Sequence, residues 1–97
     1  MIKKKRKQLS PVVVGREKRL IRQFVSIYMH YDEGYPYGTP TWRMFESYGS
    51  WVKSIGETTV ISVDGFGRLL PKHIKRKLLN RDGLVSNGAP FWRLSWP

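Results

Sequence analysis

Residues 69–96, LLPKHIKRKLLNRDGLVSNGAPFWRLSW, carry the strongest local signals in the chain. The spacing predicts a basic helix that begins at Pro71, because the first helical turn tolerates proline, whose missing N–H would have no partner there. Apolar residues four positions apart would form one buried stripe, with cations on the opposite side. The stripe comprises Leu70, Ile74 and Leu78, the cations are Lys72, Lys75 and Arg76, and Asn80 lies at the polar edge.

A hairpin is expected after this helix. Gly83 can end the helix in the left-handed conformation, and Asn87-Gly88 is a typical dipeptide of a two-residue hairpin turn. Beyond that turn Trp92, Leu94 and Trp96 alternate with Phe91, Arg93 and Ser95, as in a half-buried strand. The segment therefore predicts a helix followed by a β-hairpin, with Asn87 at the tip and Arg93 on the second strand.

Charge is distributed unevenly along the 97 residues, whose formal net charge is +11. Residues 1–22 contribute +8, residues 23–67 contribute −3, and residues 68–97 contribute +6. Cations gathered in separate segments are typical of a protein that binds a polyanion, most often nucleic acid. A solvated basic protein without such a partner is the alternative.

The N-terminus contains five consecutive cations, Lys3, Lys4, Lys5, Arg6 and Lys7. Like charges repel and bury no apolar surface, so residues 1–10 are expected to form a disordered basic arm and residues 11–97 a single domain. The arm would contact phosphates. The same residues also suit a nuclear address, contact with acidic lipids or a solubilising tail.

Two amphipathic helices are predicted in the first half of the chain, over residues 16–31 and 40–55. Pro40 would be the first residue of the second helix, after Thr39 as its N-cap, and Gly56 would end it. Their apolar faces comprise Leu20, Ile21, Phe24, Val25, Ile27, Tyr28 and Tyr31 in the first, and Met44, Phe45, Tyr48, Trp51, Val52 and Ile55 in the second.

The second helix is expected to be continuous through Gly49. A helix-turn-helix with its turn at that glycine would need a small residue four positions earlier, where Phe45 stands. Around these helices, Val12–Val14 are compatible with a short strand, residues 58–63 predict a strand, and residues 64–67 predict a turn.

Residues 31–41 form a loop in which three tyrosines alternate with glycine and proline. These rings can serve as a platform for bases or for a protein partner, with Tyr35 and Tyr37 as the candidate contacts. Rings that lie over the edge of the core, with their hydroxyls in water, are the other interpretation.

Catalytic patterns are sparse in this sequence. A metal nuclease would need acids that converge on a cation, and Asp32, Glu33 and Asp64 are the candidates, but they show no catalytic spacing. No serine stands in a nucleophile-elbow pattern, and without cysteine there is no thiolate metal site. We therefore expect a protein that is not an enzyme and uses neither a cofactor nor a metal ion.

The run KHIKRKLLNRDGLVSNGAPFWRLS, residues 72–95, together with the order of the predicted elements, resembles a winged-helix domain. The resemblance implies a small α+β domain of about three helices with a C-terminal β-hairpin. It also implies that Lys72, Lys75 and Arg76 face a groove of the nucleic acid, Asn87-Gly88 form the wing tip and Arg93 lies on the second wing strand. One departure is that the strand expected between the first two helices is replaced by residues 58–63, before the third.

These observations together predict an intracellular nucleic-acid-binding protein (cytoplasm, nucleoid or nucleus). We expect DNA more than RNA as the partner. The role would be regulatory, as in transcription, or accessory. Lysine and arginine position a protein on phosphates, and Asn80 is the main candidate to contact base edges. The alternative is a small interaction protein that modulates a nucleic-acid-processing enzyme or a ribonucleoprotein. No apolar run is long enough to cross a membrane, so no membrane partner is expected.

Overall fold

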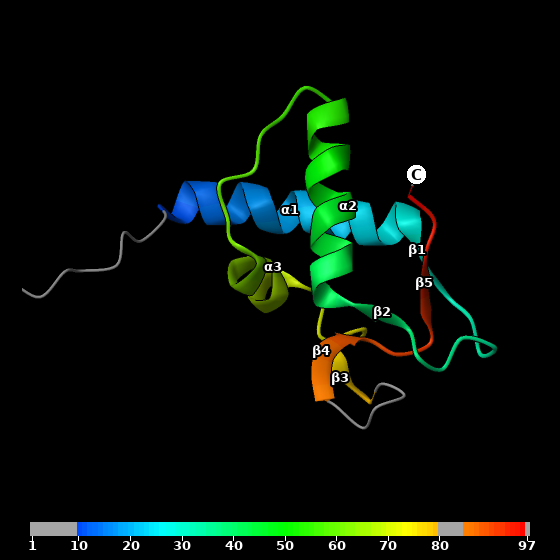
Figure 1. Cartoon of the computed structure of the whole chain (residues 1–97). Coiled ribbons are helices and arrows are strands. Elements are labelled where there is room, and N and C mark those ends of the chain that lie inside the picture. Colours follow the sequence, from blue (N-terminus) through cyan, green and yellow to red (C-terminus); the bar gives the residue numbers. More distant parts are fainter. Residues whose placement is uncertain (1–9, 80–84, 97) are drawn as a thin grey trace, which may run out of the picture.

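The computed structural model describes residues 10–79 and 85–96, with the backbone alone for residues 77–79 and 85–86. Over these residues it is an α+β domain with three helices and a β-hairpin towards the C-terminus, as predicted. Figure 1 shows α2 crossing α1, with the hairpin beyond the first turn of α2. The helices are α1 (Pro11–Tyr28), α2 (Thr41–Ser54) and α3 (Val63–Leu69), and the strands are β1 (Met29–Tyr31), β2 (Thr39–Pro40), β3 (Arg76–Leu79), β4 (Val85–Ala89) and β5 (Trp92–Leu94).

The core lies between the inner faces of α1 and α2 and is closed by α3. Phe24 of α1, Tyr48 of α2 and Phe66 of α3 are fully buried. Their rings touch, with centroids 5.8 Å apart for Phe24 and Tyr48 and 5.1 Å apart for Tyr48 and Phe66. The predicted inner faces are thus confirmed in their centres, whereas the predicted members at their ends, Ile27, Tyr31 and Ile55, are exposed.

Helix α1 begins earlier than the apolar pattern predicts. The Oγ of Ser10 accepts a hydrogen bond from the N–H of Val13 at 3.3 Å, and Pro11 is the first helical residue. A serine cap followed by proline is a strong helix start, and it outweighs the weak helix propensity of the β-branched residues that follow. Val12–Val14 are therefore helical and not a strand.

Helix α2 runs without a break through Gly49, as predicted, and Gly56 follows its end with φ +78°. Its start differs from the prediction by one residue, because Pro40 is the N-cap and makes no side-chain cap. The hydroxyl of Thr39 instead donates to the carbonyl oxygen of Trp92 at 2.8 Å. Thr39 thus joins β2 to β5 and does not cap α2.

The predicted strand at 58–63 and turn at 64–67 are both wrong. Residues 57–62 have no regular secondary structure, and α3 begins at Val63. The Oγ of Ser62 accepts a hydrogen bond from the N–H of Gly65 at 3.2 Å, which caps the helix. This cap and the burial of Phe66 override the strand preference of the β-branched run.

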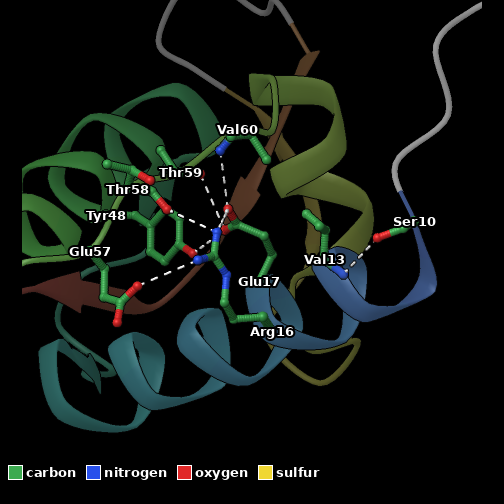
Figure 2. Close-up of polar contacts among 9 residues, drawn as sticks. All are labelled: Ser10, Val13, Arg16, Glu17, Tyr48, Glu57, Thr58, Thr59 and Val60. Atoms are coloured by element: carbon green, nitrogen blue, oxygen red, sulfur yellow. Dashed lines mark hydrogen bonds and ion pairs between the residues drawn. The ribbon is translucent and has the colours of Figure 1, made fainter.

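The connector of residues 57–62 is fastened to α1 and α2 by the buried carboxylate of Glu17 (Figure 2). The hydroxyls of Tyr48 and Thr59 donate to its Oε2 at 2.5 Å and 3.2 Å, and the N–H of Val60 donates to its Oε1 at 3.2 Å. Burial, and then the hydrogen bond to Glu17, raise the pKa of Tyr48 above its ordinary value. The tyrosine hydroxyl therefore stays protonated and remains a donor.

The predicted basic helix from Pro71 is also wrong. Proline disfavours the helical conformation in the residue before it, and Leu70 accordingly has ψ 143°, which ends α3 at Leu69. A single turn follows, in which the N–H of Ile74 donates to the carbonyl oxygen of Pro71 at 3.2 Å. The chain then enters β3 at Arg76.

Asn87-Gly88 lies within β4 and not at a turn. Asn87 stands opposite Lys77, and Gly88 stands opposite Arg76 of β3 and Pro40 of β2. The β3–β4 connection is in residues 80–84, so Asn80 and Gly83 fall outside the described residues. Strand β4 is the centre of a sheet in the order β2-β4-β3. A strand between the first two helices is therefore present, contrary to the departure expected from the sequence.

Strand β5 belongs to a different sheet from β4. It pairs antiparallel with β1, with His30 opposite Arg93. Phe91, between β4 and β5, has φ +66° and redirects the chain away from the hairpin. Arg93 is therefore not on the second strand of the hairpin.

Candidate nucleic-acid interface

A groove with several cations runs along the side of the molecule where α3, the turn after it and β4 meet. One part, about 330 Å³ in volume, includes Arg68, Lys75, Asn87 and Trp42 in its lining, together with one acid, Asp64. The adjoining part, about 400 Å³, is lined by Lys72, Lys75, Arg76 and Asn87. Lys75 and Asn87 line both parts, so we treat the two parts as one site. We call this site the basic groove and define it by Arg68, Lys72, Lys75, Arg76, Asn87 and Trp42.

The cations of the basic groove differ in how they are held. Arg68 and Lys72 are exposed, Lys75 is half-buried, and none of these three forms an ion pair with a described acid. One terminal nitrogen of Arg76 donates to the carbonyl oxygens of Lys72 at 2.8 Å and Lys75 at 2.7 Å. Arg76 therefore holds the turn that presents the two lysines.

The N-terminal end of α2 borders the same groove. Helix α2 has no side-chain cap, so the N–H groups of its first turn lack the partner that a cap would supply. The Oγ1 of Thr41 is buried without a hydrogen-bond partner, and Trp42 beside it is 57% exposed. Uncapped N–H groups and the positive end of a helix dipole favour an anion nearby.

Several residues of the groove were predicted from the sequence as nucleic-acid contacts, but their predicted placement on one helix and a wing tip is wrong. The structure brings together Lys72, Lys75, Arg76 and Asn87, yet they come from a turn, from β3 and from β4, and not from one helix face and a wing tip. Arg68 and Trp42 were not predicted from the sequence as site residues. Trp42 lies off the apolar face of an amphipathic helix, and a large aromatic in that position is the signal that could have identified it.

Among the described residues, the predicted site residue Arg93 does not line the groove. Lys3, Lys4, Lys5, Arg6, Lys7 and Asn80 lie outside the described residues. Arg93 is engaged elsewhere: its Nε and a terminal nitrogen bind Oδ2 of Asp32 at 3.0 Å and 2.9 Å, and its guanidinium lies 4.8 Å from the ring centroid of Tyr35. Arg93 fastens the loop after β1 to β5 and does not line the basic groove, and its contact with nucleic acid stays a prediction.

This loop provides a pH-dependent prediction. The N–H of Gly34 and then the side chain of Arg93 hold the pKa of Asp32 below its ordinary value of 3.8. A carboxyl with a depressed pKa stabilises the fold above its unfolded-state pKa, and this contribution is lost as the pH falls through the folded-state pKa. We therefore expect Asp32→Asn to lower the Tm at about pH 7 and to match the parent more closely at about pH 3. An equal difference in Tm at both pH values would contradict the argument.

The acids proposed for a metal nuclease do not gather in the structure. Among residues 10–79 and 85–96, no three His, Cys, Asp or Glu residues lie close enough to hold a metal ion. Asp32 is paired with Arg93, whereas Asp64 lies in the first turn of α3. In the same part of the chain, no helix is long and apolar enough to span a membrane.

Functional inference rests on the arrangement of the basic groove. Comparison of the chain with protein-family models, with curated proteins and with solved structures gives no match.

Proposed function

We propose that the protein binds duplex nucleic acid, DNA in preference to RNA, through the basic groove, in a regulatory or accessory role without catalysis. The observation that carries the proposal is the convergence of Arg68, Lys72 and Lys75, which form no ion pair with a described acid, beside the uncapped end of α2. Such an array attracts the phosphates of a nucleic acid whatever its base sequence. The basic N-terminal arm would add further phosphate contacts.

The order of the elements supports a winged-helix resemblance. A third helix precedes the β3–β4 hairpin, and β2 lies between α1 and α2 and pairs with β4. In such a domain the helix before the hairpin and the hairpin itself approach the nucleic acid. Here α3 has seven residues and brings Arg68 to the groove, while Lys72 and Lys75 come from the turn behind it.

The chemistry of the groove favours phosphate positioning over the reading of bases. Lysine and arginine fix a protein on the backbone, and base edges are read chiefly by paired hydrogen bonds from residues such as asparagine. Asn87 is exposed in both parts of the groove and is our candidate for such a contact. We therefore propose binding with weak sequence preference.

Reversing the charge at two groove positions tests the proposal. The double variant Arg68→Glu, Lys75→Glu replaces two attractions by two repulsions at a phosphate surface. We expect duplex binding to weaken by more than about tenfold at low salt, and this difference to shrink as salt rises, because the lost interaction is electrostatic. Fluorescence polarisation of a labelled DNA duplex, and of an RNA duplex of equal length, measures the effect. Arg76 is left in place because it holds the turn.

The matched control is Lys18→Glu, Lys53→Glu, which makes the same change in net charge at exposed positions away from the groove. Lys53 lies in the last turn of α2, at the opposite end from Trp42. Both double variants should keep a Tm close to that of the parent. Parent-like binding by a folded Arg68→Glu, Lys75→Glu protein would contradict the proposal. The alternative function, a protein partner held by aromatic residues, predicts that partner binding is lost on truncating Tyr35 or Tyr37.

A further inference from the structure

A second groove adjoins the basic groove on the far side of Lys72. Its volume is about 660 Å³, and its lining includes Arg22 and Val25 of α1, Lys72 and His73 of the turn, and Trp92 of β5. We call it the aromatic groove and define it by Arg22, Lys72, His73 and Trp92. Lys72 also lines the basic groove, so the two sites meet at this side chain.

The lining combines rings, apolar surface and positive charge. The rings of His73 and Trp92 have centroids 5.8 Å apart and an interplanar angle of 71°. Val25 and Met29 are buried and add apolar surface beside the rings. Arg22 and Lys72 are exposed, no acid among the described residues lines the groove, and neither cation forms an ion pair with such an acid.

This combination fits unpaired nucleotides. Proteins that bind single strands combine cations that follow the phosphates with aromatic rings on which bases stack. A duplex cannot use such rings in this way, because its bases are already paired and stacked on one another. The groove therefore offers unpaired nucleotides a stacking surface that a duplex cannot use.

We propose that the aromatic groove binds the single-stranded extension of a duplex that is held in the basic groove. The preferred ligand would then be a junction of double and single strand and not a blunt duplex. Continuity through Lys72 favours this ligand over an acidic peptide, because one nucleic-acid backbone can pass from one groove to the other. The inference rests on the proposed function, since the duplex arm of the junction occupies the basic groove.

The test compares a blunt DNA duplex with the same duplex carrying an oligothymidine extension at either the 5′ or the 3′ end. We expect an extension of one polarity to bind about tenfold more tightly than the blunt duplex, the effect of stacking about one base on an aromatic side chain. The variant Arg22→Glu, His73→Ala should lose this gain while binding the blunt duplex as the parent does. The conservative variant Arg22→Lys, His73→Tyr should restore much of the gain. Trp92 is left intact because it packs against the core.

Each outcome separates the two proposals. Equal affinity for blunt and extended duplexes would overturn the proposal that the aromatic groove binds a single strand, and it would leave the proposed function unaffected. Loss of the gain through Lys18→Glu, Lys53→Glu as well would show a nonspecific charge effect and overturn it too. Tighter binding of decaglutamate than of oligothymidine, abolished by Arg22→Glu, would assign the groove to an acidic peptide instead. Blunt-duplex binding that does not respond to Arg68→Glu, Lys75→Glu would count against the proposed function itself.

Discussion

Replacing Trp51 with alanine should lower the free energy of unfolding by about 3–5 kcal/mol, the range for removing a large buried aromatic side chain. Trp51 is 4% exposed, and its ring lies 5.7 Å from that of Phe24 and 6.1 Å from that of Tyr28 between centroids. The variant therefore leaves a cavity where α1 and α2 meet. Alanine is itself a good helix former, so the loss would come from packing and not from the helix.

Trp42 of the same helix provides the control, because it is 57% exposed. Trp42→Ala should change the free energy of unfolding by no more than about 0.5 kcal/mol, as is usual at the surface. Urea denaturation of the parent and both variants measures the difference. Similar losses for the two tryptophans would mean that the inner face of α2 has been assigned wrongly.

The contrast between these tryptophans shows what sequence alone predicts well. The helical period over α1 and α2 is long and local, so the buried side of each helix follows from the order of its own residues. Trp51 fell on the predicted inner face and is buried, and Trp42 fell outside it and is exposed. Helix ends were predicted less well, because a cap such as Ser10 adds a turn beyond the apolar pattern.

The C-terminal part was predicted poorly for a physical reason. A spacing of four residues, as in Leu70, Ile74 and Leu78, suits a helix but does not exclude a turn followed by a strand, and Pro71 can begin one helix or end another. The pairing of β4 with β2, which places Thr39 opposite Ala89, decides in favour of a turn followed by strands. A local sequence pattern cannot reveal a strand pairing between residues so far apart in the chain.

The hairpin turn illustrates the same limit. Residues 69–96 contain two dipeptides of the hairpin type, Asp82-Gly83 and Asn87-Gly88, and propensity does not rank them. The pairing of Asn87 with Lys77 excludes the second dipeptide as the turn. Because Asn87 lies in the strand, it lines the basic groove instead of projecting from a wing tip.

The basic groove could be predicted in composition but not in shape. Lys72 and Lys75 were expected on the polar side of a predicted basic helix, and the structure brings both to the groove from the turn after α3. Arg93 was expected on the second strand of the hairpin, but its strand pairs with β1, which is far away in sequence. The buried Glu17 had no sequence signal at all, since the one acid among the cations of residues 1–22 reads as a surface residue.

Removing the Glu17 carboxylate should lower the free energy of unfolding by about 3–5 kcal/mol in Glu17→Ala, as expected when one partner of a buried charged network is deleted. Three donors, from Tyr48, Thr59 and Val60, would lose their acceptor. The Tyr48 hydroxyl is buried and costs about 1–3 kcal/mol when left without a partner, whereas the donors of Thr59 and Val60 are only partly buried and cost less. Glu57→Ala is the control, because Glu57 pairs with Arg16 at 3.5 Å but is 45% exposed, and such surface pairs contribute about 1 kcal/mol or less. If the two variants lost the same free energy of unfolding, the hydrogen bonds of Glu17 would not be what holds the connector.

The position of Glu17 makes its effect on function distinct from a general loss of stability. The connector of residues 57–62 that Glu17 fastens leads directly into α3, which brings Arg68 to the basic groove. Glu17→Gln keeps one acceptor oxygen but places an amide donor among the other donors, so it should remain folded with a loosened connector. We expect faster amide hydrogen exchange in residues 60–66 and weaker duplex binding in this variant, at a temperature where it is fully folded. Trp42 belongs to α2 and Lys75 lies directly before β3, and both elements are outside the connector, so part of the binding should survive. A folded Glu17→Gln protein with unchanged exchange in α3 would show that packing of Phe66 alone fixes this helix, and the groove would then owe its shape to the core and not to the carboxylate.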